Sequence, residues 1–231
     1  MINQYIAQVA QFATFWPSVS LEIGALDGEY SRVLQRAFGL NDENLYLVEP
    51  NPALCDHLQS RFPNSNNLFC AVSVADGTGA FNQVLNPERN KTGCSSLLER
   101  VDDWQQHLSC ARTSVATLTG ASLLGRIRGQ VDLCIVDVEG LAFEVLVSFG
   151  DQLRAIRSLM IECEHSEMFR GQHLFPEVAA LLEANGFRMM AFQYSYPRQS
   201  DSVWIRNADV DLDAMKPLPD YLSQSPCQPA K

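Results

Sequence analysis

Two acidic residues and two glycines near the N-terminus are spaced as in a nucleotide-binding turn. Glu22 lies in a short apolar run and is followed by Gly24 and Gly28, while Glu49 ends the next apolar run. Glycine lets the backbone approach a ligand, and the first turn of the following helix offers free N–H groups. A carboxylate at the tip of the second run can accept hydrogen bonds from both ribose hydroxyls. The pattern predicts a site for a nucleotide-type cofactor.

The same turn argues against a dinucleotide. A G-x-G-x-x-G fingerprint needs glycine where this chain has Leu26 and Glu29. A carboxylate in the first helical turn would also repel the pyrophosphate that such a turn binds. A cofactor without phosphates fits better, and S-adenosylmethionine is the common one. An NAD-dependent oxidoreductase is the disfavoured alternative.

The strongest candidate for chemistry follows the most apolar run of the chain, at residues 131–138. Asp137 ends this run beside a glycine turn, and side chains at that end of a parallel strand face the ligand crevice. We therefore predict that Asp137 acts as a general base, or as a ligand of substrate or metal. The alternative is that it caps the helix that follows, and for Glu139 we favour capping.

The elements that must position these residues alternate along the chain. Short apolar runs are each followed by a turn and a helix-like segment, which is typical of an α/β fold with a mainly parallel sheet. The last two runs, 187–194 and 203–206, predict a hairpin that closes the sheet. The other predicted strands are 19–23, 45–48, 68–72, 131–138 and 158–164, and the predicted helices after the first are 30–38, 52–62 and 175–185.

The length of 231 residues suits one domain, and we expect residues 1–231 to form it. Residues 1–17 predict an N-terminal helix that Pro17 stops, and 209–231 predict an extended tail. The polar segment 86–113 is longer than most connections, so we interpret it as an insert or lid. The alternative is that Trp104 and its neighbours form a helix packed on the core.

Composition limits the partners. The chain has 17 Lys and Arg residues against 27 Asp and Glu residues, a net charge of −10 that disfavours nucleic acid and anionic membranes. No apolar run is long enough to span a bilayer, and the absence of a signal-peptide pattern favours a cytoplasmic protein. Seven cysteines without a CxxC pair argue against a disulfide scaffold. We expect a small-molecule partner, and the oligomeric state stays open.

Several motifs resemble those of the FkbM-type methyltransferases. Residues 135–140 read I-V-D-V-E-G, and F-E-V-L at 143–146 and Gly150 follow, as in the family's I-D-x-E-G…E-x-x-V-L…G signature. Further resemblance lies in L-E-I-G-A at 21–25 with Gly28 and Ser31, V-E-P-N-P at 48–52, T-G-C-S-S-L at 92–97 and T-L at 117–118. The resemblance covers about residues 20–208.

The resemblance implies a class I methyltransferase, Rossmann-like fold: a mainly parallel seven-stranded sheet with an antiparallel last strand and an N-terminal helix. It implies S-adenosylmethionine at the carboxyl ends of the strands and methylation of an oxygen on a small, sugar-containing or lipid-like acceptor. The implied cofactor-binding residues are Glu22, Gly24, Gly28, Ser31 and Glu49. Leu26, Val136 and Glu22 replace the family's usual Asn, Lys and Asp, which leaves a catalytically silent binding module as an alternative.

A divalent metal is a further possibility, because related methyltransferases bind one through acids after two neighbouring strands. Asp137 with Glu164 and His165 could form such a site. Glu162, which we assign to the other face of its strand, is the alternate ligand. The alternative is that these strand-end charges are solvated.

Overall fold

A seven-stranded sheet forms the centre of the computed structural model, which describes residues 1–85 and 93–215 except for the side chain of Trp104. The sheet order is β3-β2-β1-β7-β8-β10-β9, and β10 runs antiparallel to both of its neighbours. The strands are β1 (Ser20–Ile23), β2 (Leu45–Val48), β3 (Asn66–Leu68), β7 (Leu133–Val136), β8 (Ser158–Glu164), β9 (Phe187–Tyr196) and β10 (Gln199–Arg206). The predicted sheet and its antiparallel last strand are confirmed.

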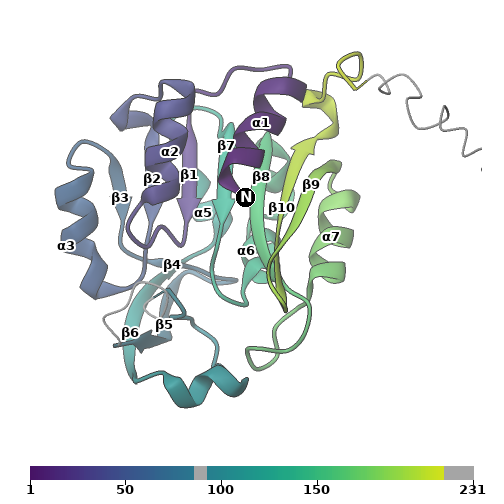
Figure 1. Cartoon of the computed structure of the whole chain (residues 1–231). Coiled ribbons are helices and arrows are strands. Elements are labelled where there is room, and N and C mark those ends of the chain that lie inside the picture. Colours follow the sequence, from purple (N-terminus) through teal and green to yellow (C-terminus); the bar gives the residue numbers. More distant parts are fainter. Residues whose placement is uncertain (86–92, 216–231) are drawn as a thin grey trace, which may run out of the picture.

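Helices cover both faces of this sheet (Figure 1). One face carries α1 (Ile2–Phe12), α2 (Glu29–Phe38) and α3 (Pro52–Arg61), and the other carries α5 (Gly120–Leu124), α6 (Ala142–Ser148) and α7 (Phe175–Ala184). All four residues of β7 are buried, as expected of a central parallel strand. Short 3-10 helices occur at Asp42–Asn44, Asp103–His107, Gly150–Ala155 and Asn207–Asp209.

The N-terminal helix is anchored at its buried face. Tyr5 and Val9 have no more than 1% exposure, and the Tyr5 hydroxyl lies 2.8 Å from Ser158 Oγ, within hydrogen-bonding distance. The predicted helix is thus confirmed, but it ends at Phe12 rather than near residue 17. Ala13 forms a β-bridge with Val210 instead, which takes the chain out of the helix.

A second, three-stranded sheet in the order β4-β6-β5 was not predicted. It consists of β4 (Ala71–Val72), β5 (Gly77–Val84) and β6 (Cys110–Leu118). The run predicted as one strand at 68–72 is divided between the two sheets. The irregular segment predicted to end at residue 113 already contains the start of β6. The first half of β5 is exposed and reads Gly-Thr-Gly-Ala, so it lacks the apolar alternation that identifies a half-buried strand.

Backbone pairing joins part of the predicted insert to the rest of the molecule. Ser96 forms a bridge with Asn82 of β5, and Arg100 forms one with Phe169. The Ser96 hydroxyl donates to the Glu139 carbonyl oxygen at 2.7 Å. Residues 86–92 and the Trp104 side chain lie outside the described residues, so the lid stays a prediction.

The predicted tail begins with packed residues. Asp209 has an exposure of 4% and accepts hydrogen bonds from the guanidinium groups of Arg157 and Arg206. These two ion pairs hold the start of the segment against the domain, while residues 216–231 lie outside the described residues. Within the described part of the chain, none of the helices is long and apolar enough to cross a membrane.

Candidate functional site

The turn after β1 brings two strands into close contact at Gly24. A Cβ at this position would lie 1.7 Å from the carbonyl oxygen of Asp137, and the backbone has a φ of +85°. The Asp137 amide in turn donates to the Ile23 carbonyl at 3.0 Å. Only glycine fits here, and the contact places the end of β7 directly against the predicted cofactor turn.

The remainder of the turn uses left-handed backbone at Leu26 and Gly28. Leu26 has a φ of 49°, a conformation that costs a leucine about 1 to 2 kcal/mol and that asparagine adopts more readily. In this chain a hydrogen bond from the Leu26 amide to Glu49 Oε2, at 2.7 Å, holds the strained residue. Gly28 precedes α2, and a Cβ there would lie 2.3 Å from the Phe62 ring.

Glu22 lies beneath this turn. Its side chain has an exposure of only 2%, and its Oε2 accepts the Ser31 amide of the first turn of α2 at 2.9 Å. Burial raises the pKa of Glu22 to about 8. The contacts of Glu22 and Ser31 therefore fix the start of α2, and a direct contact of either residue with the cofactor stays a prediction.

Glu49 connects two loops at the tip of β2. Its Oε2 accepts the Leu26 amide, and its Oε1 accepts the Asn51 amide at 2.7 Å. Burial raises the pKa of Glu49 to about 7. Asn51 caps α3 through its Oδ1, which also accepts the side-chain amide of Gln83 from β5 at 3.0 Å. A carboxylate has about four acceptor sites, so Glu49 can still accept hydrogen bonds from a ligand.

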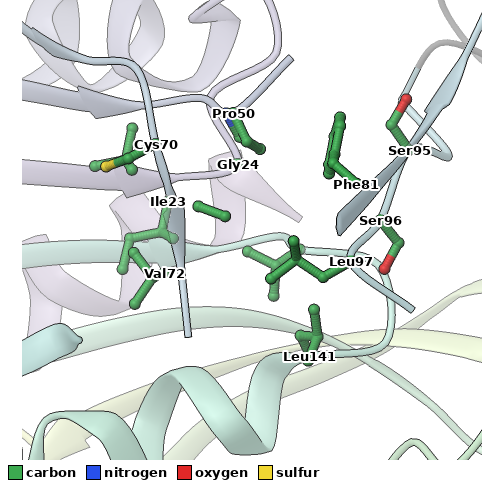
Figure 2. A pocket seen from close by; sticks show the side chains of 13 residues that line it. Ile23, Gly24, Pro50, Cys70, Val72, Phe81, Ser95, Ser96, Leu97 and Leu141 are labelled. Carbon is green, nitrogen blue, oxygen red and sulfur yellow. The ribbon is translucent and has the colours of Figure 1, made fainter. Parts of the chain in front are cut away.

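A cavity of about 310 Å³ lies beside Gly24, where β1 and β2 end (Figure 2). Its walls come from the ends of β1 and β2, from β4 and β5, from residues 95–97 of the predicted insert and from the segment after β7. The lining is mainly apolar, with two serine hydroxyls at one side. Lining residues labelled in Figure 2 include Ile23, Pro50, Cys70, Val72, Phe81, Ser95, Ser96, Leu97 and Leu141.

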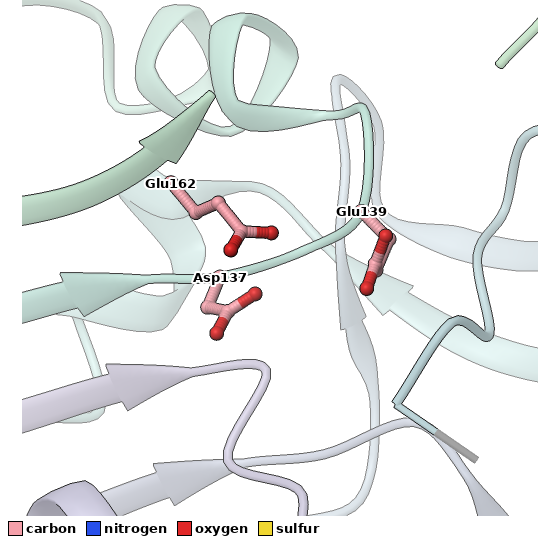
Figure 3. A group of neighbouring side chains, drawn as sticks. All are labelled: Asp137, Glu139 and Glu162. Atoms are coloured by element: carbon pink, nitrogen blue, oxygen red, sulfur yellow. The ribbon is translucent and has the colours of Figure 1, made fainter. Parts of the chain in front are cut away.

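Three carboxylates gather beyond the end of β7: those of Asp137, Glu139 and Glu162 (Figure 3). One ligand oxygen from each lies within 4.8 Å of the others. Burial, reinforced by the charge of Asp137, raises the pKa of both Glu139 and Glu162. A cluster of this kind can take up a proton or surround a cation.

The predicted capping by Glu139 is wrong. Leu141 occupies the N-cap of α6 and no side chain caps this helix. Glu139 instead has a left-handed backbone with a φ of 49°, and its carboxylate joins the cluster. Asp137 is not the N-cap residue of α6 either.

Among the described residues, the group of possible metal ligands around Asp137 does not include the predicted partners Glu164 and His165. Glu164 is 2% exposed and accepts the side-chain amide of Gln172 at 3.0 Å. His165 Nε2 lies 2.7 Å from Ser200 Oγ, and its ring contacts Phe175. Among the described residues, the carboxylates grouped with Asp137 are those of Glu139 and Glu162.

The strand face that we assigned to Glu162 was also wrong. Residues two apart in a strand share a face, so Glu162 points to the same side as Glu164. Glu162 lies two residues before Glu164 on β8, which brings its carboxylate to the end of β7. The alternation of the strand was the signal that could have found it.

Arg100 is a site residue that the sequence did not indicate. Its side chain is 9% exposed, and its Nε and Nη2 donate to the two carboxylate oxygens of Asp102 at 2.7 and 3.0 Å. Its Nη1 lies 3.8 Å from Glu139 Oε2. Arg100 thus links the predicted insert to the carboxylate cluster.

The comparison with family models identifies the chain. The model of the methyltransferase FkbM domain matches residues 22–189, which contain the cofactor turn and the carboxylate cluster. The chain belongs to the FkbM methyltransferase family. No curated protein matches it by sequence.

Solved structures show the fold of this FkbM-family chain. The plantazolicin methyltransferase BamL, in complex with a triazolic desmethylPZN analog and SAH, is similar at a TM-score of 0.53 and 8% identity, over 89% of this chain and 83% of that one. Magnesium protoporphyrin IX methyltransferase (ChlM) from Synechocystis PCC 6803, with bound SAM, has a TM-score of 0.49 and 14% identity, over 89% of this chain and 77% of that one. The likeness to BamL and the sheet order agree on the class I methyltransferase fold.

Proposed function

We propose that this FkbM-family protein transfers a methyl group from S-adenosylmethionine to a hydroxyl oxygen of a small, partly apolar acceptor. The single observation that carries the proposal is the carboxylate cluster of Asp137, Glu139 and Glu162, which adjoins the glycine turn. A group that accepts a proton therefore lies beside the predicted cofactor site. Binding of SAH by BamL is consistent with that cofactor.

The cofactor would lie across the ends of β1 and β2. Glu49 is at the tip of β2 with spare acceptor sites, which suits two ribose hydroxyls. The apolar cavity between Pro50, Val72 and Leu97 suits the face of a purine base. Gly24 then allows the backbone to approach the methionine portion.

Methyl transfer from a sulfonium is an in-line displacement in which the S–CH3 bond breaks as the O–CH3 bond forms. The protein must hold the acceptor oxygen opposite the leaving sulfur. Because a neutral hydroxyl is a poor nucleophile, its proton must leave, and we assign the acceptance of this proton to Asp137. Glu139 and Glu162 surround Asp137 and provide a route for the proton away from the site.

A divalent metal is the second candidate for activating the hydroxyl. It is favoured by the all-carboxylate composition of the cluster, since Mg²⁺ and Mn²⁺ prefer oxygen ligands. Glu139 and Glu162 would then replace the predicted ligands Glu164 and His165. Full activity after treatment with EDTA contradicts this version, whereas loss of activity restored by Mg²⁺ or Mn²⁺ supports it.

Calorimetry with S-adenosylmethionine and S-adenosylhomocysteine tests the cofactor. We expect saturable binding of both and weaker binding of NADH. A folded sample that binds neither at millimolar concentration contradicts the proposal. An acceptor screen with methyl-labelled S-adenosylmethionine then separates an enzyme from a silent binding module, and labelled nucleic acid as the product would contradict the acceptor class.

A further inference from the structure

A second cavity, of about 400 Å³, lies on the other side of the predicted insert. It shares no lining residue with the cofactor cavity. Its walls come from β5, the start of β6, residues 94–108 and the loop after β8. The apolar lining residues are Val84, Leu98, Leu108 and Phe169, beside the thiols of Cys94 and Cys110. The polar and charged lining residues are Asn82, Glu99, Arg100 and Gln105.

The charged residues in this lining are already paired. Arg100 forms its double hydrogen bond with Asp102. Glu99 forms a surface ion pair with Arg170 at 3.0 Å. Burial raises the pKa of the Cys94 thiol to about 12, so this group is neutral at physiological pH. An ionic ligand in the cavity would lose its hydration without gaining a counter-charge, and the lining therefore selects an uncharged, apolar ligand.

The cavity adjoins the carboxylate cluster through Arg100. The guanidinium lies 5.1 Å from the centroid of the Phe169 ring, which also lines the cavity, and 3.8 Å from Glu139 Oε2. Glu139 in turn belongs to the cluster with Asp137. A molecule whose apolar part occupies the cavity can thus extend a polar group past Arg100 toward the proton acceptor.

We propose that this cavity binds the apolar part of the methyl acceptor, and that the acceptor is an uncharged aromatic or aliphatic alcohol whose hydroxyl points toward Asp137. This inference rests on the proposed function, since it assigns a binding site to the acceptor of that reaction.

The test uses benzyl alcohol as the probe, with benzoate and benzylamine as charged molecules of the same ring size. Binding is measured by calorimetry on the full chain saturated with S-adenosylhomocysteine. Benzyl alcohol should bind saturably, and each charged analogue should bind at least about fivefold more weakly. Equal or tighter binding of a charged analogue overturns the proposal.

Leu108→Trp fills the cavity, and Val147→Trp adds the same side chain to an exposed position on α6, away from both cavities. Leu108→Trp should weaken benzyl alcohol binding about tenfold and leave the affinity for S-adenosylhomocysteine unchanged. Val147→Trp should change neither value. Equal benzyl alcohol binding by the two variants, or no saturable binding by the unmodified chain at millimolar concentration, overturns the assignment of the cavity. Failure to bind S-adenosylhomocysteine instead overturns the proposed function.

Discussion

The cofactor side and the acceptor side of the site use carboxylates in opposite ways. On the cofactor side, Glu22 and Glu49 accept backbone N–H groups of the loops around them. On the acceptor side, Asp137, Glu139 and Glu162 lie close together, and burial together with the charge of Asp137 raises the pKa of the other two. Carboxylates bound to amides hold a structure, whereas carboxylates that face each other are suited to proton transfer. The two sides should therefore respond differently to substitution.

Gly24→Ala should have the largest effect, because it breaks the contact between the two sides. The new Cβ would lie 1.7 Å from the Asp137 carbonyl oxygen, and we expect a loss of at least about 4 kcal/mol in the free energy of unfolding. Urea denaturation measures this loss. Gly39→Ala is the control, since that glycine also has a positive φ but no atom within 4 Å, and it should cost only about 1 kcal/mol. Equal losses in the free energy of unfolding of the two variants would contradict the close approach of Gly24 to the Asp137 carbonyl oxygen.

Asp137→Asn should affect the acceptor side alone. We expect kcat to fall by about a hundredfold or more, because a general base is lost, while calorimetry shows unchanged cofactor affinity. Asp151→Asn, at an exposed position, is the matched control. A variant that loses cofactor affinity rather than turnover would show that Asp137 belongs to the cofactor side.

Glu49→Ala should affect the cofactor side alone. We expect cofactor binding to weaken by about 1.5 to 3 kcal/mol, the cost of losing hydrogen bonds to a charged group. The exposed Glu43→Ala serves as the control in the same calorimetric titration. Unchanged affinity in Glu49→Ala would mean that the carboxylate only holds the loops of Leu26 and Asn51.

Glu22→Gln should act through the pH dependence of stability. The pKa of Glu22 is raised from 4.5 to about 8, so between these values the folded chain keeps a proton that the unfolded chain has lost. Its contribution therefore makes the free energy of unfolding decrease with rising pH, by up to about 1.4 kcal/mol per pH unit.

Glu22→Gln removes this contribution, so the stability of the variant relative to the unmodified chain should increase from about pH 5 to about pH 8. Urea denaturation at both values measures the difference. The control is Glu183→Gln, at an exposed position, which should keep the pH dependence of stability of the unmodified chain. If the free energy of unfolding has the same pH dependence in Glu22→Gln and in the unmodified chain, Glu22 is not buried in its protonated form.

The elements around the proposed cofactor turn could be predicted because their signals are local. An apolar run, a glycine turn and a helix follow one another within residues 20–38, and the bounds of β8 agree with the prediction at both ends. The acceptor side joins distant segments, such as Arg100 and Glu139, and no local periodicity encodes that contact. The exposed glycines of β5 likewise gave no strand pattern. The grouping of Glu162 with Asp137 could be predicted from the sequence, because residues 162 and 164 lie on the same face of a strand.

Strand β5 is a wall that the two proposed ligand sites have in common. Phe81 lines the cofactor cavity, Asn82 and Val84 line the second cavity, and Gln83 donates to Asn51 beside Glu49. If cofactor binding orders this strand and so raises the affinity for the acceptor, thermodynamic reciprocity applies. The acceptor must then raise the affinity for the cofactor by the same factor. Synergistic binding of the two ligands, in either order, is the behaviour expected of such an arrangement. Slower amide hydrogen exchange along β5 with either ligand would be its direct signature.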